Sequence, residues 1–262
     1  MRKNMRTNMI LSVAAALALL LVALQQIHAQ SSVAFPSETF DRTVSLAPGG
    51  SFAIENVNGA VAITGWDRDA VEIHAVKTAS LAADLGRVQI DVAATPGRVQ
   101  IDTVDPHEDG VEVAVNYSVR VPRRVLLQEV ATVNGSVRVT GVNAMGELHS
   151  VNGDIEVSDS AGGFSARTTN GDIHMELDRL ATTGPLAVET VNGTIALALP
   201  ANAAANLDVR SLNGDFQSQL PVVYLGAYRP RELHGRLGAG GALLQLRTVN
   251  GSIRVQTLPQ GI

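Results

Sequence analysis

The sequence lacks cysteine altogether, so it can form neither a disulfide nor a thiolate metal site. Aromatic residues make up only 3% of the 262 residues, which leaves few rings on which nucleic-acid bases could stack. Paired histidines at helical spacing are also missing, so the sequence predicts no metal site and no cofactor. The fold must therefore be stabilised by its apolar core or by the packing of repeated units.

Only the N-terminus carries a long apolar run. Three basic residues lie among the first six, residues 9–24 are uncharged and rich in Ala and Leu, and Ala29 offers a small-residue cleavage site. This pattern predicts a secretory signal peptide over residues 1–29 and a mature chain that begins at Gln30. The alternative is an uncleaved anchor, although a run of 16 residues is short of the roughly 20 that span a bilayer.

The charge balance excludes some classes of binding partner. Removal of residues 1–29 would leave 17 Lys and Arg against 25 Asp and Glu, a net charge of −8. An acidic surface repels nucleic acid and anionic lipid headgroups, so we expect no nucleic-acid partner. Contact with a membrane is expected only through the N-terminal segment, if it is not cleaved. The expected location is the periplasm, the cell surface or the medium.

An Asn-Gly dipeptide occurs seven times, with steps of 18, 18, 22 and 21 residues between the second and the sixth copy. Such short spacing leaves no room for a helix between copies and predicts a stack of small β units. The dipeptides that define these structural repeats are Asn58, Gly59, Asn134, Gly135, Asn152, Gly153, Asn170, Gly171, Asn192, Gly193, Asn213, Gly214, Asn250 and Gly251.

Alignment on the dipeptide gives uniform columns. The residue before Asn is apolar in six copies of seven, the residue before that is small and polar, and the second residue after Gly is always apolar. The two apolar columns are three residues apart, so the chain must bend or bulge at Asn-Gly. A meander of hairpins would explain the turns, because Asn-Gly is a strong hairpin signal. We favour a β-solenoid, because stacked coils also explain the Ser/Thr column as an internal hydroxyl ladder and allow the Asn amides to bond from coil to coil.

The predicted fold is therefore all-β: a β-solenoid, or β-helix-like stack, of Asn-Gly repeats over residues 128–262. Its test is whether Ile155, Ile173 and Ile195 align in a row. Residues 30–127 hold the first repeat and longer alternating strands, which predict an antiparallel strand region covering the N-terminal end of the stack. We expect these two regions to form one continuous domain. Residues 224–241, which contain Pro230 and several glycines, are expected to form a surface loop.

Two motifs carry a family resemblance. The stretch from Ser51 to Lys77 includes Gly65-Trp66-Asp67, and Val121-Pro122 precedes the V-N-G-D-I and T-N-G-D-I repeats in the expected order. The mature chain thereby resembles the bacterial "putative adhesin" domain family, from about Phe40 to Val255. The resemblance implies an exported, all-β, solenoid-like domain of unknown function, and it brings no catalytic residues.

Acidic residues at outward positions of the central repeats are the one candidate site. On adjacent parallel coils such residues would lie about 4.8 Å apart, and paired carboxylates are the usual groups of glycoside hydrolysis. A solvated strand face is the simpler interpretation, and the acidic loop Asp105–Gly110 lacks the ligand spacing of a calcium site. The residues of the candidate acidic face are Asp154, Glu156, Asp172, His174 and Glu176.

We therefore predict an exported cell-envelope protein that is not an enzyme and acts as a scaffold or adhesin-like surface for a protein or glycan of the envelope. One alternative is a carbohydrate-active enzyme that uses the acidic face. The other is an envelope sensor with an uncleaved N-terminal anchor.

Overall fold

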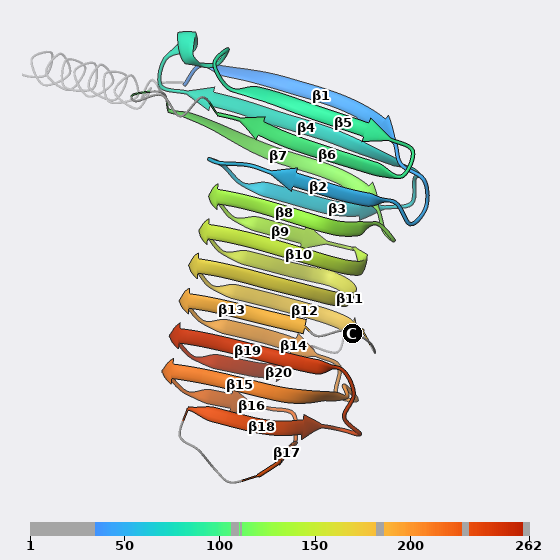
Figure 1. Cartoon of the computed structure of the whole chain (residues 1–262), viewed down its shortest axis with the longest axis vertical. Coiled ribbons are helices and arrows are strands. Elements are labelled where there is room, and N and C mark those ends of the chain that lie inside the picture. The colour runs from blue at the N-terminus through green and yellow to red at the C-terminus, as the bar shows by residue number, and fades with distance from the viewer. Residues whose placement is uncertain (1–34, 106–109, 111, 182–185, 227–230, 259–262) are drawn as a thin grey trace, which may run out of the picture. The chain divides into compact units, whose positions relative to one another are not determined.

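The computed structural model describes residues 35–105, 110, 112–181, 186–226 and 231–258 (Figure 1). The described residues from Pro36 to Leu258 belong to one compact unit. The predicted signal peptide lies outside the described residues, as do most of the Asp105–Gly110 loop and Pro230. Among the described residues, no helix has both the length and the hydropathy required to cross a membrane.

Two long β-sheets face each other across the core, and strand β11 runs through both. We call them sheet I and sheet II. Sheet I consists, in spatial order, of β5 (Gln89–Thr95), β6 (Arg98–Val104), β2 (Ser51–Glu55), β8 (Leu126–Asn134), β10 (Asn143–Asn152), the second half of β11 (Ile155–Asn170), β13 (Leu186–Asn192), β19 (Leu243–Asn250), β15 (Ala205–Asn213), β18 (Glu232–Leu237) and β17 (Val222–Tyr224). Sheet II consists of β1 (Ser37–Ser45), β4 (Ala70–Ala79), β7 (Val113–Pro122), β3 (Val61–Trp66), β9 (Val137–Thr140), the first half of β11, β12 (Ile173–Leu180), β14 (Ile195–Leu199), β20 (Ile253–Thr257) and β16 (Phe216–Ser218).

Each coil of the stack is a strand of sheet I, an Asn-Gly corner and a strand of sheet II. Neighbouring coils pair in parallel and in register, and Ile155, Ile173 and Ile195 align in one row. The Asn side chains form a continuous amide ladder, in which each Nδ2 donates to the Oδ1 of the neighbouring Asn at 2.7–2.8 Å. The prediction of a β-solenoid is confirmed.

Glycine is required at the corners because the backbones of neighbouring coils approach closely there. A Cβ built on Gly171 would overlap the carbonyl group of Gly153, and one built on Gly153 would overlap that of Gly135. The same overlap recurs along the stack, so any side chain at these positions would push two coils apart.

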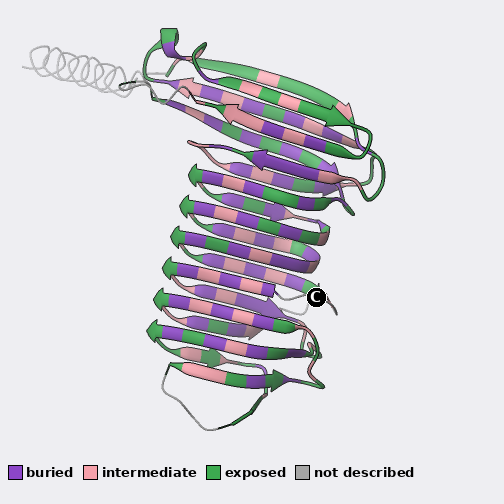
Figure 2. Cartoon of the chain, viewed as in Figure 1, coloured by how far each residue is buried: buried purple, intermediate pink, exposed green. Residues whose placement is uncertain are grey.

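The core is a mainly aliphatic column between the sheets, and burial alternates along the strands of the stacked coils (Figure 2). The Ser/Thr column is buried as expected, but its hydroxyls do not bond to one another. Thr168 donates to the carbonyl of Gly153, and Thr190 donates to that of Gly171, each at 2.9 Å. Each hydroxyl thus satisfies the corner glycine of the neighbouring coil. The apolar residues that precede Asn point outward, because side chains alternate along a strand.

The N-terminal strands extend both sheets beyond the first coil. In sheet II, β1, β4 and β7 pair antiparallel, and in sheet I, β5 and β6 pair antiparallel. The strands β6 and β7 then pair in parallel with β2 and β3 of the first coil. A short 3-10 turn, η1 (Ala82–Asp84), follows β4. The buried Lys77 donates to the carbonyls of Leu85 and Val88 just beyond this turn.

The order of the Asn-Gly coils departs from the chain order near the C-terminal end of the stack (Figure 1). The last coil, β19 and β20, lies between the coil of β13 and β14 and the coil of β15 and β16. The ladder therefore runs from Asn192 to Asn250 to Asn213. The expectation of a plain surface loop over residues 224–241 is wrong, because this segment contains β18, which pairs antiparallel with β15. The inserted coil leaves β15 as the last parallel strand of sheet I, and β18 pairs with its outer edge.

Candidate functional site

The candidate acidic residues lie on the outer surface of sheet II, on the neighbouring strands β11 and β12 and their corners. Two of them hold the corners together. Asp154 accepts a hydrogen bond from the backbone N–H of Asp172 at 2.8 Å, and Asp172 accepts one from the N–H of Thr194 at 2.6 Å. Their carboxylates therefore already bind the neighbouring coil.

The other three candidates have ionic or hydrogen-bonded partners. Glu156 binds Arg138, with 2.6 Å between Oε2 and Nη2. His174 lies beside Glu156 in the register of the sheet, but its Nε2 contacts Glu176 on its own strand at 3.2 Å. The structure thus brings the five residues to one face but does not place two unpartnered carboxylates together. Within the described ranges, no group of three or more His, Cys, Asp or Glu side chains could hold a metal ion.

Tyr117 is a buried titratable group inside the stack. It lies on β7 and is 2% exposed, and its hydroxyl lies 2.7 Å from the Oγ1 of Thr103. Burial raises the pKa of Tyr117 to about 12, the hydrogen bond with Thr103 opposes this shift, and the charge of Asp102 adds to it. The group is too deeply buried to take part in a surface site.

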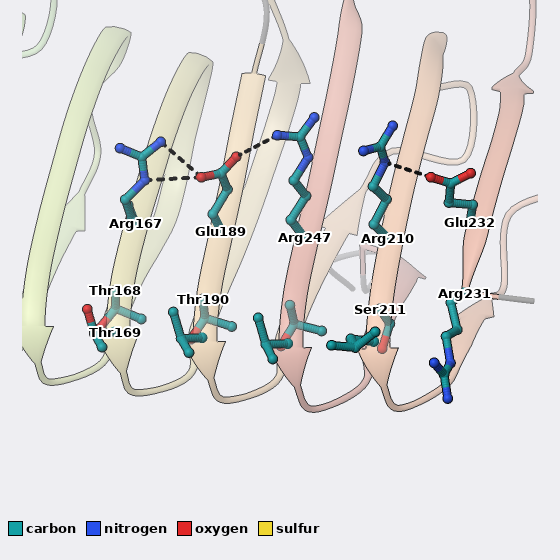
Figure 3. Close-up of a pocket in the computed structure, with 14 residues that line it drawn as sticks. Arg167, Thr168, Thr169, Glu189, Thr190, Arg210, Ser211, Arg231, Glu232 and Arg247 are labelled. Carbon is teal, nitrogen blue, oxygen red and sulfur yellow. Dashed lines mark hydrogen bonds and ion pairs between the residues drawn. The ribbon is translucent and has the colours of Figure 1, made fainter.

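Sequence reasoning missed a groove of about 670 Å³ on the outer surface of sheet I. It crosses β11, β13, β19 and β15 and reaches the start of β18 (Figure 3). Two rows of outward side chains border it, and they come from positions two residues apart on each strand. The charged row is Arg167, Glu189, Arg247, Arg210 and Glu232; the aliphatic row is Val191, Val249 and Leu212, and the polar Thr169 occupies the same column on β11.

The charged row is paired unevenly. Arg167 binds Glu189 at 2.9 Å, whereas the contacts of Arg247 with Glu189 and with Asp208 are 3.4 and 3.6 Å long. Arg210 lies 3.5 Å from Asp208 and 3.4 Å from Glu232. The ion pair at the Arg167 end of the groove is therefore close, whereas the contacts at the Arg247–Arg210 end are long; we call the latter the loose end.

Two arginines are direct neighbours at the loose end. Arg247 pairs with Arg210 across β19 and β15, a like-charge pair that disfavours the strand pairing. Asp208, with 15% of its side chain exposed, lies beside both. Among the described residues, the buried Nε of Arg247 and Oδ1 of Asp208 have no hydrogen-bond partner. The contacts of Asp208 with the two arginines are therefore long and incomplete.

The aliphatic row exposes apolar surface to solvent. Val191 is 41% exposed, Val249 37% and Leu212 50%. The same column continues beyond the groove with Val133 and Val151. Strand alternation could have revealed this row from the sequence, because a buried Ser/Thr column requires its neighbour to face outward. The Arg247–Arg210 contact could not have been found in this way, since it depends on the insertion of the last coil.

The two-sheet parallel stack with Asn-Gly corners defines the chain as a β-solenoid protein with an outward groove. It belongs to the Toastrack DUF4097 family, whose profile matches residues 27–256. The resemblance to the "putative adhesin" family is thereby confirmed. No curated protein shows significant sequence similarity to the chain.

Solved structures with a similar arrangement come from Clostridium, Bacteroides and Parabacteroides species. A "putative cell adhesion protein" from Clostridium sporogenes is 9% identical, with 84% of this chain and 100% of that chain covered and a TM-score of 0.48. A "putative adhesin" from Bacteroides fragilis is 9% identical, with 83% and 97% covered and a TM-score of 0.33. A "putative lipid binding protein" from Parabacteroides distasonis is 8% identical, with 85% and 97% covered and a TM-score of 0.29. Similarity at this level says nothing about what this chain binds.

Proposed function

We propose that this protein is an exported, non-enzymatic module of the cell envelope that binds an elongated ligand in the groove of sheet I. The groove is the observation that carries the proposal, because it combines exposed aliphatic side chains with a charged rim on a rigid stack of strands. Concave, partly apolar surfaces with a few polar groups are the usual form of ligand sites. Export is supported by the signal-peptide pattern of residues 1–29.

The hydrogen bonds and ion pairs of the acidic face favour a binding protein over an enzyme. A glycosidase needs one carboxyl group as acid and another as base or nucleophile, both free to approach the substrate. Here Asp154 and Asp172 accept backbone hydrogen bonds at the corners, and Glu156 is paired with Arg138. Such contacts stabilise the stack and leave these carboxylates little freedom to act on a substrate.

The test compares two pairs of substitutions in the same outward column. Val249→Asp with Leu212→Asp alters the groove, and Val133→Asp with Val151→Asp is the matched control outside it. The mature chain and both variants are applied to a panel of envelope glycans, lipid vesicles and purified envelope proteins. We expect the groove variant to lose a ligand that the control retains, with equal melting temperatures.

The enzymatic alternative predicts a different result. Polysaccharide cleavage would then be detected with the wild-type chain and abolished by Glu156→Gln, while the groove variant would keep its activity. That result would overturn the proposal. Equal binding of every ligand by the groove variant and the control would also overturn it.

A further inference from the structure

We infer that the ligand of this groove is a single-chain anionic amphiphile, a long-chain carboxylate or phosphate monoester, with its anionic group on Arg247 and Arg210 and its chain along the aliphatic row. This inference rests on the proposed function, since it names the ligand class of the same groove.

The dimensions of the groove favour one linear chain. Neighbouring strands lie about 4.8 Å apart, so the four strands from β11 to β15 give the groove a length of about 14 Å. The charged and aliphatic rows lie two residues apart along each strand, a separation of about 7 Å. Because apolar groups pack at about 4 Å, one extended chain fits between the rows and two do not.

The width also argues against a protein partner. A stable protein–protein interface takes roughly 20–30 residues on each side. The groove is lined by 14 residues, and its aliphatic row is one side chain wide. The described lining contains no aromatic ring on which the face of a sugar could stack. An alkyl chain needs only a continuous aliphatic strip, which Val191, Val249 and Leu212 provide.

The charged row favours an anionic group. The lining contains four arginines and two glutamates, with Asp208 beside it, although the protein as a whole has a net charge of −5. Arg247 and Arg210 are cross-strand neighbours that share Asp208 through contacts of 3.5–3.6 Å, and the buried Nε of Arg247 has no acceptor in the described structure. Guanidinium groups bind carboxylate and phosphate through paired, charge-assisted hydrogen bonds. A ligand anion there would relieve the repulsion between the two arginines.

The rest of the charged row limits where that anion can sit. Arg167 is held by Glu189 at 2.9 Å, and Arg231 extends away from the row (Figure 3). An anion on Arg167 would have to displace this close pair, whereas the contacts of Arg247 and Arg210 with their carboxylate neighbours are 3.4–3.6 Å long. The Arg247–Arg210 pair is therefore the preferred position, with Val249 and Leu212 on the same two strands to receive the start of the chain.

The experiment measures binding of laurate and dodecyl phosphate, whose chains match the length of the groove, to the mature chain by isothermal titration calorimetry, below their critical micelle concentrations. Dodecanol tests the chain without the anion, and inorganic phosphate tests the anion without the chain. We expect saturable binding of laurate, dodecyl phosphate or both, and no measurable binding of either fragment probe. The tighter of the two amphiphiles identifies the headgroup.

Substitutions in the groove then test where the amphiphile binds. Arg247→Met should weaken binding on the order of tenfold, since charge-assisted hydrogen bonds are lost, whereas Arg138→Met on sheet II should leave it unchanged. Val249→Thr with Leu212→Thr should weaken binding several-fold, and Val133→Thr with Val151→Thr should not. Arg210→Met serves as the second rim variant if Arg247→Met does not fold.

Two results separate this inference from the proposed function. Suppose that neither amphiphile binds, but that Val249→Asp with Leu212→Asp abolishes binding of a glycan or protein of the panel. The ligand class is then wrong, and the proposal that the groove binds a ligand is upheld. An anionic polysaccharide such as polygalacturonate would be such a ligand. If amphiphiles bind with affinities that no groove variant alters, the inference is wrong and the groove is not their site.

Discussion

Replacement of a corner glycine by alanine tests the stacking that the whole fold depends on. In Gly171→Ala the new Cβ would lie 2.6 Å from the carbonyl carbon of Gly153, an atom of the neighbouring backbone that cannot rotate away. Relief requires the two coils to separate, which weakens the 3.0 Å bond from the Gly153 N–H to the Asn170 carbonyl and the 2.9 Å bond from the Thr168 hydroxyl to the Gly153 carbonyl. Overpacking costs about 1–3 kcal/mol and each weakened hydrogen bond about 1 kcal/mol, so we expect a loss of about 3 kcal/mol.

The assay is thermal unfolding followed by circular dichroism. For a domain of this size each kcal/mol lowers the melting temperature by about 2–4 °C, so Gly171→Ala should lower it by about 6–12 °C. Gly97→Ala is the matched control, because a Cβ on this turn glycine meets no atom within 4 Å. Equal melting temperatures for the two variants would refute the argument that close approach of the coils selects glycine.

Three further predictions concern the core, the pH response and export. Thr190→Val should cost about 1–2 kcal/mol in chemical unfolding, since it removes the buried bond to the Gly171 carbonyl, whereas Thr169→Val, at an exposed position of the adjacent strand, should cost almost nothing. The pKa of Tyr117 is raised from 10.0 to about 12, so its contribution to stability is complete below pH 10 and is lost as the pH rises to about 12. The wild type should then lose up to about 3 kcal/mol more than Tyr117→Phe over this range in urea unfolding, and parallel pH profiles would contradict this. Mass spectrometry of the protein from native cells should find Gln30 as the first residue, in a soluble fraction; an intact N-terminus in the membrane fraction would favour the anchor.

The repeat columns were sufficient to predict the fold class. Asn-Gly at short intervals indicated coils rather than helices, and the uniform Ser/Thr column distinguished stacked coils from hairpins. The Asn-Gly corners and the Ser/Thr column are both found in the structure, because the same contacts recur from coil to coil. The partner of the hydroxyls was predicted wrongly, since the close approach of the corners places a glycine carbonyl nearer to each hydroxyl than the next hydroxyl.

The groove was less accessible to sequence reasoning. Its aliphatic row is visible as a column, but an apolar residue beside a turn is ordinarily read as core. To predict its charged row, one must know the spatial order of the coils, in which Arg210 lies next to Arg247 and not next to Glu189. The acidic residues that the sequence did single out are structural in large part, because a short Asp at a tight corner is well placed to accept the N–H of the next coil.

The insertion of the last coil has a physical cause in the composition of the two final repeats. The coil of β19 and β20 presents Ile253 and Val255, which are 0% and 1% exposed, to the interior. The equivalent residues of the coil of β15 and β16 are Phe216, which is only partly buried, and Ser218, whose hydroxyl donates to the carbonyl of Leu220. A buried hydroxyl inside the aliphatic column would be costly, whereas at the end of the stack it finds a backbone acceptor. The more apolar coil is therefore enclosed on both sides and the weaker one closes the stack, and it is this exchange that brings Arg247 beside Arg210.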